Sequence, residues 1–182
     1  ALALGVQRMA HQNAIVKRLS SGETLGSTNI ICTDKTGTIT TSEMTVREAW
    51  AGDDHYTVTG REHSLKGTLK PAPHAIPPHS PEALAWLLRC AVLCNNGIPP
   101  QPHRHRAGLG DPLDEALLVL AMKGGMDPDE ERQRWPRIRE FSFDASRRLM
   151  STQHKNAEGE FLFVKGGPAE VLSRCSHEMR NG

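Results

Sequence analysis

An aspartate at the end of a short apolar run is followed by a loop of hydroxyl residues and glycine. Asp34 follows the β-branched run at residues 30–33 and opens the sequence DKTGT. If that run forms a buried strand, Asp34 lies at its carboxyl end, where open α/β sheets bind ligands. Such a carboxylate can hold Mg²⁺, attack phosphorus, or do both. The loop would bind phosphate oxygens through backbone N–H groups and side-chain donors, and it comprises Lys35, Thr36, Gly37 and Thr38.

An aspartate that only caps a turn is the simpler explanation, but it does not account for all of DKTGT. Residues 13–46 resemble the phosphorylation segment of the P-type cation-transporting ATPases, and most of all the calcium-pump-like branch. These pumps belong to the haloacid-dehalogenase-like group. The resemblance implies that ATP phosphorylates Asp34. It also implies that Asp34, together with the backbone carbonyl of Thr36, holds Mg²⁺.

The residue two positions after the aspartate favours a pump over a soluble phosphatase of the same group. Simple phosphatases carry a second aspartate there as general acid and base. This chain has Thr36, which cannot transfer protons near neutral pH. An enzyme without that acid makes a long-lived acyl phosphate, which suits a pump whose intermediate must drive a conformational change.

Two further segments resemble the nucleotide-binding domain of the same family. EFSFDASRRLMS is similar to the family's Phe-x4-Lys pattern, which implies that Phe143 stacks on adenine and Arg148 lies near the phosphates. Phe141 is the alternative stacking residue, two positions earlier. FVKGGPAEVL is similar to a Lys-Gly-Ala-Pro-Glu segment. It implies that Lys165 reaches the nucleotide, with room for the base or ribose left by Gly166 and Gly167.

A third segment, GDPLDEAL, resembles the family's Gly-Asp-Pro-Thr-Glu helix start. In that family the acidic residue contacts the adenine amino group, which assigns this role to Asp114. A carboxylate in the first turn of a helix also stabilises the helix dipole, and this second explanation is equally good.

The elements that must position these residues can be read from periodicity and capping residues. Helices are expected over residues 1–19, from Pro81 to a stop at Gly97, between Asp111 and Gly124, and after Asp127. Strands are expected at residues 30–33, 43–50, 56–58, 138–143, 149–153 and 161–164, with a short closing helix at 169–175. The predicted class is α+β: an antiparallel sheet with flanking helices, preceded by the first strand of a haloacid-dehalogenase-like α/β phosphorylation domain. The resemblance divides the chain into a stalk helix with the start of the phosphorylation domain (1–45) and a nucleotide-binding domain (46–182).

Composition limits the possible partners. The 22 basic and 21 acidic residues give no basic excess for nucleic-acid binding. No apolar run approaches the ~18 residues of a membrane span, and the chain begins without methionine. We therefore expect the cytosolic piece of an integral pump of the cell membrane, with ATP and the other pump domains as partners. The transported cation is expected to bind elsewhere in the pump.

Two other functions stay as alternatives to the pump: a soluble Mg²⁺-dependent phosphatase or phosphotransferase, and a non-catalytic nucleotide-binding regulator. The family's later phosphorylation-domain motifs are absent from these 182 residues. The chain alone is therefore expected to bind adenine nucleotide without turning it over, because phosphoryl transfer needs charge neutralisation that those motifs supply.

Overall fold

The chain forms two compact units, Ala1–Ser42 and Glu43–Gly182, which are described separately. The computed structural model describes residues 2–18, 20–35, 38–40, 44–60, 64–73, 81–100 and 111–179. No helix in this described part of the chain has the length and apolar character that a membrane crossing requires.

Two short helices, α1 (Leu2–His11) and α2 (Ser20–Gly26), lie in the described part of the first unit. The expectation of one helix over residues 1–19 is wrong, because α1 ends at a C-terminal cap. Asn13 has a φ of 60°, and the N–H groups of Asn13 and Ala14 donate to the carbonyls of Ala10 and Met9. This is the Schellman arrangement, in which a left-handed residue closes a helix.

The strand expected at residues 30–33 is not formed. Ile30 and Ile31 are 79% and 75% exposed, and the backbone there is in neither helix nor strand. An isolated strand has no partner for its backbone groups, and the described part of the first unit contains no other strand. The β-branched pattern therefore does not produce a strand in this unit by itself.

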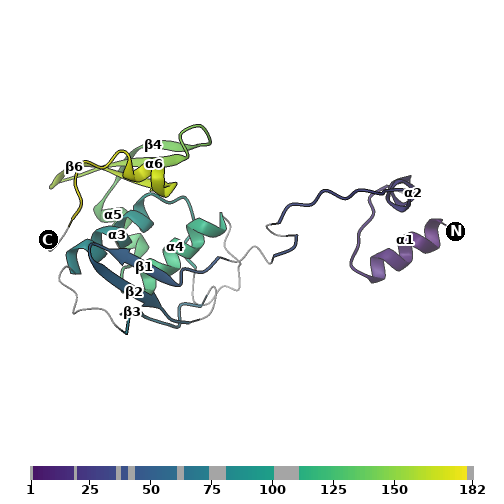
Figure 1. Cartoon of the computed structure of the whole chain (residues 1–182), viewed down its shortest axis with the longest axis horizontal. Helices are drawn as coiled ribbons and strands as arrows, with labels where there is room; N and C mark the ends of the chain where they lie inside the picture. Colours follow the sequence, from purple (N-terminus) through teal and green to yellow (C-terminus); the bar gives the residue numbers. More distant parts are fainter. Residues whose placement is uncertain are drawn as a thin grey trace. The chain divides into compact units, whose positions relative to one another are not determined.

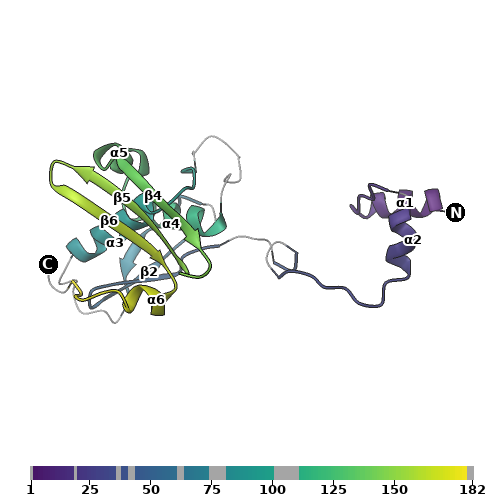
Figure 2. The ribbon, with the colours of Figure 1, turned by 90° about the horizontal axis from the view of Figure 1, so that it is seen from above.

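The described residues of the second unit form two three-stranded antiparallel sheets and four helices. The first sheet has the order β1 (Glu48–Ala51), β2 (Asp54–Val58), β3 (Leu69–Pro71). The second has the order β4 (Arg137–Asp144), β5 (Leu149–Asn156), β6 (Gly159–Gly166). The helices are α3 (Pro81–Leu93), α4 (Pro112–Lys123), α5 (Pro128–Arg134) and α6 (Pro168–Leu172). Figures 1 and 2 show both sheets with the helices.

The α+β class with antiparallel strands is confirmed, but the strands form two sheets, and α3 packs against both. It contacts β1 of the first sheet and β6 of the second. One hydrophobic cluster runs from Val58 of β2 through Leu93 and Leu118 of the helices to Met150 and Phe163 of the second sheet. The short strand β3 was not predicted from the sequence.

Local capping explains why α4 and α5 begin where the sequence predicts. The carboxylate of Asp111 accepts a hydrogen bond from the N–H of Leu113, and that of Asp127 accepts from the N–H groups of Asp129 and Glu130. In each helix a proline follows the capping aspartate, where its missing N–H costs nothing. These two helix starts are confirmed.

Helix α3 ends at Leu93, earlier than the expected stop at Gly97. The carboxamide of Asn95 donates back to the carbonyl of Ala91 and accepts from the N–H of Gly97, which replaces the next helical turn. The predicted Gly97 stop is therefore wrong by about one turn, because an asparagine side chain competes with the helical backbone bonds.

Helices α3 and α5 meet the second sheet at a group of aromatic side chains. Trp135 is 1% exposed, and its ring lies edge-on to Phe161 and Trp86 at centroid distances of 4.8 Å and 5.8 Å. The guanidinium of Arg89 lies 4.6 Å from the Trp86 ring centre and bonds Glu131 of α5 at 2.9 Å. This packing holds α3, α5 and the second sheet together, and α4 joins them through Leu118.

Candidate functional site

Two residues predicted from separate motifs form a buried ion pair. Asp114 lies in the first turn of α4 and is 7% exposed. Lys165 lies near the end of β6, and its ammonium group bonds Asp114 Oδ1. The second oxygen, Oδ2, accepts the backbone N–H of Asn96 at 2.9 Å. A cation and a carboxylate of the predicted nucleotide site are thus brought together, and each neutralises the other.

The turn after α3 connects this pair to strand β4. The carboxamide of Asn95 donates to the backbone carbonyl of Asp114 at 2.8 Å. The carboxamide of Asn96 donates to Glu140 and accepts from Arg137. The sequence analysis did not identify these residues as part of the site, and the only local signal was a pair of asparagines beyond a helix end.

Phe143 and Arg148 lie at the end of the β4–β5 hairpin. The register changes between Phe141 and Asp144, so β4 has one extra residue opposite β5. Such a bulge interrupts the regular alternation of side chains along the strand. A spacing of two residues therefore does not by itself place Phe141 and Phe143 on one face of the strand.

The two phenylalanines differ in their surroundings. Phe143 is 63% exposed. Phe141 is half-buried, and the guanidinium of Arg139 lies 4.7 Å from its ring centre. An exposed ring is the one that can stack on a base without first leaving a protein contact, which favours Phe143 as the stacking residue.

Arg148 has a left-handed backbone conformation in the hairpin turn, with a φ of 51°. Asp144 caps the same turn by accepting the N–H groups of Ser146 and Arg147. The Arg148 guanidinium lies in an exposed pair with Glu170 of α6 at 3.2 Å. Exposed pairs contribute little to stability, so a phosphate could replace Glu170 at small cost.

The packing of the chain leaves no room for a side chain at Gly166. A side-chain carbon at this position would lie 2.3 Å from the backbone oxygen of Arg148. The next residue, Gly167, donates its N–H to that same oxygen at 3.0 Å. The absence of a side chain at Gly166 is therefore explained by the close approach of β6 to β5 and needs no ligand. A side-chain carbon at Gly167 would meet only the flexible carboxylate of Glu170.

The DKTGT segment lies in the first unit, and only part of it is described. Asp34 is exposed, and its Oδ1 accepts the N–H of Lys35 at 2.7 Å. Thr38 is also exposed, while Thr36 and Gly37 lie outside the described residues. Among the side chains that the structure describes, no three His, Cys, Asp or Glu residues gather as a metal site. Mg²⁺ is often bound through one or two carboxylates with substrate phosphates, so a single exposed Asp34 fits this ion.

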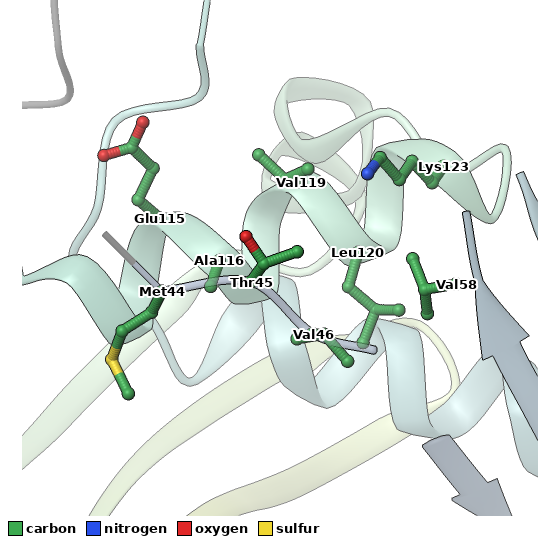
Figure 3. A pocket seen from close by; sticks show the side chains of 9 residues that line it. All are labelled: Met44, Thr45, Val46, Val58, Glu115, Ala116, Val119, Leu120 and Lys123. Carbon is green, nitrogen blue, oxygen red and sulfur yellow. The ribbon is translucent and has the colours of Figure 1, made fainter. Parts of the chain in front are cut away.

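A small cavity of about 10 Å³ lies between α4 and residues 44–46 (Figure 3). It has room for about one water molecule, far too little for a nucleotide. Lys123 is 8% exposed here, and neither its Nζ nor Thr45 Oγ1 has a hydrogen-bond partner among the described residues. Burial, and to a lesser degree the Arg47 guanidinium, lower the pKa of the Lys123 amine below its usual value.

This pKa shift predicts a pH-dependent stability. The unfolded chain binds the Lys123 proton more tightly than the folded chain, so the free energy of unfolding should rise as pH increases from neutral toward about pH 10. Lys123→Met should remove that rise, and Lys70→Met, at an exposed lysine, should retain it. Urea denaturation across this pH range measures the effect. Parallel pH profiles for wild type and Lys123→Met would contradict it.

Comparison with known proteins identifies the class. The sequence model of a family described as "P-type ATPase, cytoplasmic domain N" matches residues 83–182. The chain therefore belongs to the P-type ATPase family, which confirms the resemblance drawn from its motifs.

Individual relatives match over nearly the whole chain. It is 38% identical over 181 residues to the calcium-transporting ATPase lmo0841 of Listeria monocytogenes and 37% identical over 185 residues to a calcium-transporting ATPase of Bacillus subtilis. It is 35% identical over 179 residues to the cation-transporting ATPase pma1 of Synechocystis. These matches cover 100%, 100% and 96% of this chain but only 19%, 21% and 20% of the relatives, so the chain spans about a fifth of their length.

Proposed function

We propose that this chain is the phosphorylated and ATP-binding portion of a membrane pump that uses ATP to transport a cation. The observation that carries the proposal is the match to cation-transporting ATPases across the whole chain, which includes both DKTGT and the nucleotide-domain motifs. Calcium is the favoured cation, because two of the relatives are named calcium-transporting ATPases. Related sodium, proton or magnesium pumps are alternatives.

In this proposal residues 1–45 are the stalk and the start of the phosphorylation domain, and residues 46–182 are the nucleotide-binding domain. The Asp34 carboxylate attacks the γ-phosphorus of ATP. The bond from that phosphorus to the β,γ-bridging oxygen breaks, and ADP leaves with the electron pair. Thr36 provides no general base for the attack of water, so the acyl phosphate persists. Asp34 and the backbone carbonyl of Thr36 would hold Mg²⁺, which neutralises phosphate charge when bound.

The nucleotide site would be formed by the hairpin end and by the Asp114–Lys165 pair. The exposed Phe143 ring supplies a stacking surface for adenine, and the exposed Arg148 guanidinium can exchange Glu170 for a phosphate. The Asp114 carboxylate retains acceptor capacity beyond its two hydrogen bonds, because its oxygens together offer about four lone-pair sites. It can therefore accept the adenine amino group while still paired with Lys165.

Truncation of the stacking residue tests nucleotide binding. Phe143→Ala should weaken ATP binding by the 182-residue chain several-fold, since stacking on a base is worth roughly 1–3 kcal/mol. Phe141→Ala should chiefly lower stability, because that ring is half-buried beneath Arg139. Titration of each variant with ATP and Mg²⁺, followed by amide chemical shifts, measures both affinities. If Phe141→Ala weakens ATP binding more than Phe143→Ala does, the stacking residue of the Phe-x4-Lys pattern would be Phe141.

A further inference from the structure

Two arginines bond the turn that contacts Asp114, and Arg137 makes most of these bonds, while Arg132 donates only to the carbonyl of Gly97 at 3.0 Å. The Arg137 guanidinium donates through Nη2 to the carbonyls of Leu93 and Asn95, at 2.8 Å and 2.6 Å. Through Nη1 it donates to Asn96 Oδ1 at 2.6 Å and to Glu140 at 2.9 Å. The two carbonyls belong to the last residue of α3 and to a residue just beyond it, where backbone acceptors have no helical donor. A single planar fork therefore connects β4 to the backbone of residues 93–96.

The turn at residues 95–97 bonds Asp114 at two points, its carboxylate and its backbone carbonyl. The N–H of Asn96 donates to Asp114 Oδ2, and the carboxamide of Asn95 donates to the backbone carbonyl of Asp114. Lys165 holds only the other carboxylate oxygen. The lysine is a flexible point donor, whereas a backbone N–H in a fixed turn defines one direction. The orientation of Asp114 therefore depends on the turn, and Arg137 ties residues 93–96 of that turn to β4.

We propose that Arg137 is a positioning residue for recognition of the nucleotide base, acting through the 95–97 turn on Asp114. The inference rests on the proposed function, since it takes Asp114 as the acceptor for the adenine amino group. Without the guanidinium fork, the carbonyls of Leu93 and Asn95 and the carboxamide of Asn96 lose a shared donor. The turn can then relax, and the N–H of Asn96 no longer holds the Asp114 carboxylate in one direction.

The binding of two nucleotides that differ at the base amino group separates this role from a structural one. Inosine triphosphate has a carbonyl oxygen where ATP has the amino group, so it has no amino N–H at that position to donate to Asp114. In the 182-residue chain, Arg137→Met should weaken ATP binding about fivefold and leave inosine triphosphate binding within about twofold, as expected for one lost hydrogen bond. Arg137→Lys keeps the charge but lacks the planar fork. It should lower the ratio of ATP affinity to inosine triphosphate affinity by a smaller factor than Arg137→Met.

Arg134→Met is the matched control, because Arg134 forms an exposed pair with Glu158 at 3.0 Å and its loss removes the same charge. It should leave both affinities unchanged. In an Asp114→Ala background, which has no side-chain acceptor, Arg137→Lys should no longer alter the ratio of the two affinities.

Three results would overturn the inference. The first is an equal loss of ATP and inosine triphosphate binding in both Arg137 variants, which indicates a structural role. The second is a wild-type chain that binds both nucleotides equally. The third is an Arg137→Lys effect that persists without the Asp114 carboxylate. A wild-type chain that binds neither nucleotide would instead contradict the proposed function itself, and the two failures are therefore distinguishable.

Discussion

In the full-length pump that we propose, Asp34→Asn is expected to abolish the hydroxylamine-sensitive phosphoenzyme formed from ATP. Asp34 is the exposed acidic side chain of the DKTGT segment, and its carboxylate oxygen is the atom that must bond to phosphorus. A neutral carboxamide has no anionic oxygen to attack and cannot form an acyl phosphate. Radiolabelled γ-phosphate retained on acid-quenched protein, with and without hydroxylamine, measures the intermediate.

A matched control is available in the same unit. Glu23 of α2 is an exposed carboxylate, and Glu23→Gln makes the same chemical change away from the motif. This variant should retain phosphorylation at the wild-type level. A normal phosphoenzyme level in Asp34→Asn would refute the assignment of the phosphorylated residue.

Lys165→Met is expected to destabilise the second unit by about 3 kcal/mol, because it leaves the Asp114 carboxylate buried without a cation. In the pair, the side chains of Lys165 and Asp114 are 20% and 10% exposed, so solvent can screen an unpaired charge only in part. Adding Asp114→Asn to Lys165→Met removes that charge and should recover part of the loss. Urea denaturation followed by tryptophan fluorescence reports on this unit, which contains all three tryptophans.

The exposed pair between Lys155 and Glu160 is the control for a lost lysine. Its atoms lie 2.8 Å apart, but the side chains are 61% and 50% exposed. Lys155→Met should cost little stability, as for surface ion pairs in general. If Lys165→Met costs no more than Lys155→Met, the burial of the Asp114–Lys165 pair has no energetic consequence and the prediction is wrong.

The sequence by itself determined the features that depend on neighbouring residues. The starts of α4 and α5 follow from an aspartate cap and a proline, whose bonds reach only two or three residues along the chain. The β4–β5–β6 meander follows from three short strand-forming runs joined by short turns. The family was also readable from short motifs, above all DKTGT, because each motif is contiguous in the chain.

The local sequence pattern did not predict the secondary structure correctly where that structure depends on contacts with other side chains or segments. The β-branched residues 30–33 have strand propensity, yet they are exposed and unpaired, since a strand needs a neighbour to satisfy its backbone groups. The extent of α3 was set by Asn95, whose side chain replaced the next helical bonds. Strand β3 was missed because three residues beside a proline carry too little pattern.

The arrangement of the candidate site was decided by tertiary structure alone. Asp114 and Lys165 are separated by 51 residues, and Arg137 bonds the carbonyl of Leu93 across 44. A sequence motif indicates which side chains can bind a phosphate or a base, but it carries no information on which of them neutralise each other before a ligand arrives. Only the packing of α3 and α4 against the second sheet determines that Lys165 is paired with Asp114 and that Arg137 holds the turn beside it.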